Sequence, residues 1–329
     1  MYDVITVGSS TVDVFARTKF SEIVKITDGK KETELLAYPM GAKILIEELN
    51  FTTGGGATNT AVALSRLGHK VACISKIGSG ANADKIKKHL EKDNVDSSLL
   101  VSSKNARTGY SIILDSIEHD RTILTFKGSN NDLRFDEINT GKLRAKWFYF
   151  STMMGESFKT LEKLAKFAEK NSIKIAFNAS QYMAEKGIDY SKEILKRTAL
   201  FVLNKEEALL MTKKNKTEDA FKILGKLIDI VIITDGKNGA QAYDGKNIYS
   251  VKSNKIKIVE TTGAGDAFAS TFLSGMIKKN DIEFALRLAR ANAESVIQRH
   301  GAKTGLLTYS KALEVVKRYP GGVAKRALK

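Results

Sequence analysis

The sequence predicts an α/β fold in which a doubly wound, mostly parallel sheet is flanked by helices and carries a small β-sheet lid. Short β-rich runs alternate with helical segments through most of the chain, as in such sheets. Two β-rich insertions, at 15–52 and 105–128, interrupt the alternation and are best explained as a small sheet folded over a site. The length of 329 residues, 43% of them hydrophobic, suits one large domain with an insertion or two modest domains. We therefore assign 1–14, 53–104 and 129–329 to the core and the two insertions to the lid.

The individual elements follow from hydrophobic periodicity and from glycine punctuation. Strands are expected in the core at 3–7, 71–77, 146–150, 173–178, 200–203, 230–234 and 256–259, with a hairpin at 240–243 and 248–251. Helices are expected at 56–67, 83–92, 158–169, 190–196, 204–211, 217–227, 268–277, 284–299 and 311–318. In the lid, strands are expected at 31–38 and 43–51, and a hairpin of 107–114 and 121–127 turns around 118–120.

Composition narrows the class of protein. No run of about 18 apolar residues exists, so no transmembrane helix is expected. The N-terminus contains Asp3 and no basic stretch, which is typical of a first strand rather than a signal peptide. The single cysteine, Cys73, lies in an apolar run and indicates a buried structural thiol and a reducing, cytoplasmic location. The formal charge of +16 is spread over many helical faces, so we expect a small anionic substrate rather than nucleic acid.

The stretch 260–268, Glu-Thr-Thr-Gly-Ala-Gly-Asp-Ala-Phe, follows a β-rich run and leads into an apolar-periodic segment. It is typical of a strand end, a glycine turn and a helix N-terminus, where backbone N–H groups and the helix dipole favour an anion. Asp266 would there accept the proton of a hydroxyl that attacks a bound phosphate. It could equally be a capping carboxylate beside glycines that only shape the turn. This stretch alone leaves both interpretations open.

A second candidate region is the glycine run 54–56 with the small-residue helix behind it. Glycines let the backbone approach a ligand closely, and Asn59 would point its amide toward that ligand; tight packing without a ligand is the alternative. Asp13 follows the first strand and is either a turn aspartate or an acceptor for substrate hydroxyls. The run 78–83 nearly matches the dinucleotide fingerprint but lacks a well-placed acid, and the absence of a Walker A motif excludes a P-loop site.

Three elements coincide in this chain: the glycine run with Asn59, an Asn204-x-x-Glu207 helix start, and the run Thr262-Gly-Ala-Gly-Asp266. In their order and spacing the chain resembles the ribokinase-like PfkB carbohydrate kinase family, from the first strand to about Gly305. The resemblance implies a ribokinase-like fold. It also implies phosphorylation of a hydroxymethyl group of a sugar or sugar derivative, with ATP and Mg²⁺.

The resemblance further implies roles for individual residues. Asp266 corresponds to the catalytic base, and the backbone amides of Gly263, Ala264 and Gly265 correspond to the anion hole for the transferring phosphoryl group. Contacts with sugar hydroxyls are implied for Asp13, Gly54, Gly55 and Asn59. Contacts with the nucleotide are implied for Asn204, Thr234, Gly236, Gly265 and Asn292, the last at the adenosine end. Glu207 and Asn204 are implied to organise Mg²⁺ and its waters.

Two departures from the family pattern bear on the cation and on the acceptor. Glu260 stands where the family often has an aspartate linked to a monovalent cation, so activation by K⁺ is in doubt. Ser79 and Gly80 stand where many members carry acids near the sugar, so the acceptor need not be ribose. A hydroxymethyl sugar, a sugar acid and a nucleoside all stay open. Arg107 in the lid either meets an anionic acceptor or faces solvent.

Three alternatives to a sugar kinase stay open. A nucleoside kinase would share the scaffold and mechanism, and a basic nucleic-acid-binding protein would lose affinity steeply with salt. A degenerate kinase would bind nucleotide without turnover, and the intact Asp266, Glu207 and Asn59 argue against it. Because the unpaired edges of an exposed lid sheet seek partners, we expect a homodimer through the lid.

Overall fold

The computed structural model describes residues 1–29, 31–115 and 121–328. The largest element in these ranges is a nine-stranded sheet. Its order is β17 (Ala324–Ala327), β16 (Asn247–Val251), β15 (Ala240–Tyr243), β14 (Ile230–Thr234), β13 (Leu200–Asn204), β12 (Lys174–Asn178), β11 (Ala145–Ser151), β1 (Tyr2–Val7) and β6 (Val71–Ile74). The strands from β14 to β6 run parallel, and β15 to β17 continue the sheet antiparallel. The predicted mostly parallel sheet is confirmed.

Helices cover both faces of this sheet. One face carries α1 (Gly56–Arg66), α2 (Ala81–Lys92), α7 (Ala264–Lys279) and α8 (Ile282–Val296), with α9 (Tyr309–Arg318) packed on α8. The other face carries α3 (Gly155–Lys170), α4 (Gln181–Leu195), α5 (Lys205–Thr212) and α6 (Thr217–Leu224). Side chains alternate along each strand: Phe148 and Phe150 of β11 enter the core under α3, and Tyr149 between them enters the core under α1 and α7. A strand buried on both sides therefore supplies two cores, as a doubly wound fold requires.

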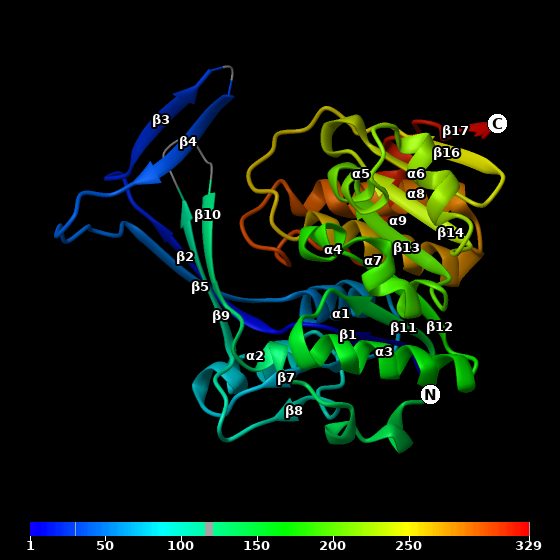
Figure 1. Ribbon diagram of the computed structural model, residues 1–329, viewed down its shortest axis with the longest axis horizontal. Coiled ribbons are helices and arrows are strands. Elements are labelled where there is room, and N and C mark those ends of the chain that lie inside the picture. The colour runs from blue at the N-terminus through cyan, green and yellow to red at the C-terminus, as the bar shows by residue number, and fades with distance from the viewer. Residues whose placement is uncertain (30, 116–120, 329) are drawn as a thin grey trace.

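A smaller sheet stands beside this core (Figure 1). Within the described residues it contains, in order, β10 (Arg121–Phe126), β9 (Gly109–Asp115), β2 (Thr11–Arg17) and β5 (Glu48–Gly54). A hairpin of β3 (Glu22–Asp28) and β4 (Lys31–Ala37) extends from it away from the core (Figure 1). The exact division into core and lid stays a prediction, and the small sheet reaches beyond the expected ranges at Thr11 and Gly54. The expected turn at 118–120 lies outside the described residues.

Several expected elements differ from the structure. The predicted strand at 256–259 is wrong: the N–H groups of Val259 and Glu260 both donate to the carbonyl of Ile297, at 2.8 and 3.1 Å, so this segment packs against the end of α8. The predicted strand at 71–77 is broken after Ile74, because β7 (Lys76–Ile77) pairs with β8 (Val101–Ser102) in a separate sheet. The strand expected at 43–51 begins only at Glu48. The periodicity does not predict β2, β3 or β17.

The single cysteine lies inside the core. Cys73 in β6 is fully buried, and burial raises the pKa of its thiol to about 12. The prediction of a buried structural thiol is confirmed, whereas the cytoplasmic location stays a prediction. Across the described parts of the chain, none of the helices combines the length and the apolar character needed to cross a bilayer.

Candidate active site

The start of α7 depends on a glycine. Gly263 precedes the helix with a φ of 78°, and a Cβ placed on it would lie 2.5 Å from the Cβ of Ala302. Both the backbone conformation and the space therefore require glycine. The N–H of Ala264 is directed at the carbonyl of Thr261 over 3.3 Å, a long bond for which an anion could substitute. Asp266 lies in the first helical turn, so amides and a carboxylate occur at one place.

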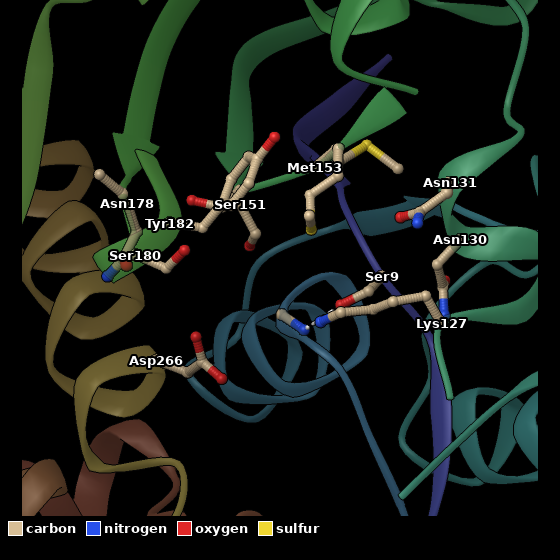
Figure 2. A pocket seen from close by; sticks show the side chains of 14 residues that line it. Ser9, Lys127, Asn130, Asn131, Ser151, Met153, Asn178, Ser180, Tyr182 and Asp266 are labelled. Atoms are coloured by element: carbon tan, nitrogen blue, oxygen red, sulfur yellow. Dashed lines mark hydrogen bonds between the residues drawn. The ribbon is translucent and has the colours of Figure 1, made fainter. Parts of the chain in front are cut away.

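A cavity of about 250 Å³ opens beside Asp266 (Figure 2). Its walls come from the loop after β1, the start of α1, the segments after β11 and β12, and a short 3-10 helix at 128–131. Most of its lining groups are polar, among them Ser9, Asn130 and Tyr182. Figure 2 shows Lys127 extending across the cavity toward Ser9, with Asp266 on a facing wall. The cavity thus combines a carboxylate, a cation and hydrogen-bonding groups, as a small polar ligand would require.

The glycine run brings Asn59 against Asp266. Gly55 has a φ of 99°, and a Cβ placed on it would lie 2.4 Å from the carbonyl oxygen of Ser9, so only glycine fits between the end of β1 and the start of α1. Asn59 follows in the first turn of α1, and its Nδ2 donates to Oδ2 of Asp266 over 2.9 Å. Two motifs far apart in the sequence therefore meet through one hydrogen bond.

Asp13 lies in β2 rather than in a turn. Its side chain is buried, Oγ1 of Thr11 donates to its Oδ1 over 2.8 Å, and burial raises the pKa of its carboxyl group. A Cβ on Gly54 would lie 1.8 Å from Oδ2 of Asp13, so this glycine makes room for the carboxylate. Asp13 is not among the residues that line the cavity in Figure 2. It is near Asp266 all the same, because both carboxylates interact with the buried ammonium group of Lys303.

The electrostatics of Asp266 suit a proton acceptor. Burial raises the pKa of its carboxyl group to about 6, although its side chain keeps part of its surface open to the cavity. The hydrogen bond from Asn59 and the charge of Lys303 oppose this rise. A carboxylate that is ionised at neutral pH and has a pKa near 6 is a better base than an ordinary aspartate.

A larger cleft, of about 910 Å³, shares the start of α7 with the cavity. Three residues expected at the nucleotide line it, namely Thr234, Gly236 and Gly265. Much of its remaining wall is apolar and includes Ile256 and Ile258, from the segment that was expected to be a strand. The irregular path of that segment therefore builds part of the cleft.

Asn292 is not among the residues that line the cleft, so the structure gives no support to its predicted place at the adenosine end. It is fully buried, its Nδ2 donates to Oγ1 of Thr271 over 2.7 Å, and its Oδ1 accepts from the N–H of Leu307 over 2.8 Å. Both ends of the amide are thus occupied inside the core. On the same helix, Arg290 and Glu294 line the cleft instead.

Asn204 and Glu207 form a capping box at the start of α5. Oδ1 of Asn204 accepts from the N–H of Glu207, and Oε2 of Glu207 accepts from the N–H of Asn204, each over 2.8 Å. Asn204 is the register partner of Thr234, so the pair lies at the carboxyl edge of the sheet beside the cleft. In the described ranges no group of three or more His, Cys, Asp or Glu side chains could hold a metal. The carboxylate and amide oxygens of Glu207 and Asn204 are of the kind that Mg²⁺ prefers in proteins.

Two lysines at the site have no signal in the sequence. Arg107 is exposed and does not line the cavity, whereas Lys127, which follows the neighbouring strand at the same end of the hairpin, does. Lys303, in the loop after α8, is buried at 5% exposure against Thr53 and Asn59. Neither lysine belongs to a motif, and only the folded chain places them here.

The mostly parallel sheet, the separate small sheet and the glycine-opened start of α7 give this protein a ribokinase-like fold. The profile described as "pfkB family carbohydrate kinase" matches residues 23–308, and the chain belongs to that family. The resemblance inferred from the motifs is thereby confirmed.

Individual relatives agree with this assignment. An "Uncharacterized sugar kinase" of Archaeoglobus fulgidus is 29% identical over 247 residues, which cover 74% of this chain and 98% of the relative. The 5-dehydro-2-deoxygluconokinase of Bacillus licheniformis is 25% identical over 279 residues, which cover 80% of this chain and 86% of the relative. A solved structure of a putative ribokinase II of E. coli in complex with ATP and Mg²⁺ has the same fold, with a TM-score of 0.80, 19% identity and coverage of 97% and 100% of the two chains.

Proposed function

We propose that this protein is an ATP- and Mg²⁺-dependent kinase that phosphorylates a hydroxymethyl group of a sugar or sugar derivative, with Asp266 as general base. One observation carries the proposal: the start of α7 borders both spaces of the site. Asp266 lines the small cavity, and Ala264 and Gly265 line the larger cleft. An acceptor in the cavity and a nucleotide in the cleft would therefore meet at this helix N-terminus, where amides stabilise negative charge.

The chemistry requires one proton transfer and one displacement. Asp266 removes the proton from the acceptor hydroxyl, whose oxygen bonds to the γ-phosphorus while the bond to the β-phosphate oxygen breaks, giving a phosphate ester and ADP. Asn59 keeps the carboxylate in place through Oδ2. The backbone amides of residues 263–265 face the charge on the transferring group.

The donor and the metal are proposed on family grounds and on the oxygen groups at α5. The E. coli relative holds ATP and Mg²⁺. When bound, Mg²⁺ would neutralise phosphate charge, and Glu207 and Asn204 would hold its waters. We leave K⁺ out of the proposal: Glu260 replaces the aspartate of the family pattern, and its Oε2 accepts from the N–H of Gly301 over 2.9 Å.

A sugar acid is the acceptor that the cavity favours. Its volume of about 250 Å³ suits one sugar ring better than a nucleoside. Lys127 supplies a cation on the lid side of the cavity, so the role first expected for Arg107 passes to Lys127 in our proposal. The Bacillus licheniformis relative is named for 5-dehydro-2-deoxygluconate, which is itself a sugar acid. A carboxylate paired with Lys127 would leave the hydroxymethyl end of the acceptor free to meet Asp266.

The test is a panel of acceptors with ATP and Mg²⁺, read by release of ADP. Neutral sugars, sugar acids and nucleosides are compared at equal concentration, with the Asp266→Asn variant as the blank. We expect the highest kcat/KM with a sugar acid. Turnover with nucleosides alone would support the nucleoside kinase alternative, and no turnover with any acceptor would refute a sugar kinase.

We further propose that a second copy of the chain covers one face of the small sheet. The register places Phe51 opposite Val14, Val14 opposite Ile112, and Ile112 opposite Leu124, so these side chains form one apolar stripe across four strands. Phe51, Ile112 and Leu124 are 51%, 38% and 53% exposed. Val14, in the middle of the stripe, is only 6% exposed, so the exposed apolar side chains lie on β5, β9 and β10. Such side chains mark an association surface, and β5 and β10 at the sheet edges offer unpaired backbone groups.

A further inference from the structure

Lys303 is a buried lysine that contacts Asn59, the residue bonded to the proposed base. Its ammonium group donates to the carbonyl oxygen of Thr53, to Oγ1 of Thr53 over 2.9 Å, and to Oδ1 of Asn59 over 3.2 Å. The three N–H donors of the ammonium thus meet three neutral acceptors. Burying an ammonium group is unfavourable unless it is compensated, so its presence at 5% exposure calls for a role.

The contacts of Lys303 determine how the amide of Asn59 is oriented. An amide has one accepting end and one donating end, and an ammonium group can only donate. Because Lys303 occupies Oδ1 of Asn59, the Nδ2 end points at Oδ2 of Asp266, which it meets at 2.9 Å. A reversed amide would set its oxygen against the carboxylate, which is tolerable only when Asp266 is protonated.

Charged groups surround this lysine from several elements. Carboxylates reach it from Asp13 in β2, Asp93 after α2 and Asp266 in α7, and Arg66 in α1 opposes them. Asp93 is itself bonded to Nε of Arg66 over 2.7 Å, so this guanidinium shares the charge of Asp93 with the ammonium. Burial lowers the pKa of Lys303 to about 8, and the three carboxylates counteract that fall, so the group is charged at neutral pH. A further titratable side chain, His89 of α2, faces the same hydroxyl of Thr53, over 2.9 Å.

We propose that Lys303 is a positioning residue of the transfer reaction, which locks the amide of Asn59 and keeps Asp266 ionised so that it can accept a proton at neutral pH. This inference rests on the proposed function of Asp266 as base. Lys303 acts through Asn59 and through its charge, without touching the acceptor.

The test compares Lys303→Met, which removes the charge, with Lys303→Gln, which keeps one donor for Asn59. The first readout needs no substrate: the carboxyl ¹³C resonance of Asp266 in the apo protein, assigned by its loss in Asp266→Asn, is followed against pH. We expect its midpoint near 6 in the wild type, and higher by about one pH unit in Lys303→Met, because a nearby cation favours a carboxylate. The acid limb of kcat/KM for the best acceptor of the panel should move equally, so that activity at pH 6 falls about fivefold more than at pH 8.

Lys76→Met is the matched control. Lys76 is also a buried lysine, at 6% exposure, but its Nζ is bonded to Glu137 over 2.7 Å and to the carbonyl of Asp132 over 2.9 Å. Its loss should lower the thermal stability and leave the Asp266 midpoint and the acid limb unchanged. A folded Lys303→Met variant with the wild-type midpoint and acid limb would overturn the inference.

The remaining outcomes distinguish a failure of this inference from a failure of the proposed function. If neither Lys303 variant folds, the wild-type resonance of Asp266 decides: a second inflection near pH 8, where Lys303 loses its proton, supports the coupling, and a flat curve there refutes it. If Asp266→Asn retains turnover, the proposed function fails. If Asp266→Asn is inactive but the titration midpoint of Asp266 is the same in Lys303→Met as in the wild type, only the inference about Lys303 fails.

Discussion

Replacing Asp266 with asparagine should remove activity and stabilise the fold at the same time. The substitution keeps the shape of the side chain, and the new amide oxygen can still accept the hydrogen bond from Nδ2 of Asn59. It cannot accept a proton from a hydroxyl, so we expect kcat to fall by about 10² to 10⁴. Binding of ATP should be nearly unchanged, because the cleft is lined by Ala264, Gly265 and residues of other elements.

The gain in stability follows from the pKa of the carboxyl group. A rise from 3.8 to about 6 corresponds to about 3 kcal/mol between the two protonation states, at about 1.4 kcal/mol for each pKa unit. Because the side chain is partly open to the cavity, we reduce this to about 1 kcal/mol. The folded pKa lies above the unfolded one, so the wild type loses this free energy of unfolding as the pH rises from about 4 to about 6. Asp266→Asn should therefore exceed the wild type by about 1 kcal/mol above pH 6, and the difference should shrink toward pH 4.

The assay combines ADP release at pH 8 with urea unfolding between pH 4 and 8. Asp84→Asn is the matched control, since Asp84 is an exposed aspartate in the first turn of α2, and neither readout should change. Turnover of Asp266→Asn within tenfold of the wild type would rule out its role as base. If the difference in the free energy of unfolding between the two proteins stays constant from pH 4 to 8, burial does not destabilise the ionised carboxylate of Asp266.

Three further substitutions test the cavity, the helix start and the lid. Lys127→Met should raise KM for sugar acids about tenfold or more and leave KM for neutral sugars unchanged, because it removes a charged hydrogen bond; an equal change for both would contradict the role of the cation. Gly263→Ala should lower kcat by about 10² and destabilise the protein, since its φ is 78° and Ala302 fills the space. Gly245→Ala is the control, because Gly245 has a φ of 87° but open space around it, so this substitution should reduce stability only. A similar loss of kcat in Gly263→Ala and Gly245→Ala would refute the anion hole. Leu124→Glu should convert dimers to monomers in sedimentation at micromolar concentration. Thr125→Glu, on the opposite face of β10, is the control and should leave the dimer intact. A wild type that is monomeric at this concentration would refute the lid dimer.

Local patterns in the sequence were enough to predict the fold class and the glycine turn at the start of α7. Alternating β-rich and helical runs predict the doubly wound sheet, because each element follows from the periodicity of its own residues. The glycines at 55 and 263 signal turns that need positive φ, which both adopt. The same local patterns misassign 256–259 as a strand, because whether an apolar alternation finds a partner strand depends on its neighbours in space.

Contacts between distant residues decided the rest of the site. Asn59 and Asp266 are 207 positions apart, and Asn59 and Lys303 are 244 apart, yet one amide joins all three. Contacts can also place a residue away from an expected site. The family pattern assigns Asn292 to the nucleotide, but both ends of its amide form hydrogen bonds inside the core. The sequence by itself determined the sheet, the glycine turns and the carboxylate that follows them, because these depend on short-range sterics and periodicity. Only the tertiary structure decided which charges face that carboxylate. In the sequence an exposed lysine and a buried lysine cannot be told apart, because burial results from packing between distant residues.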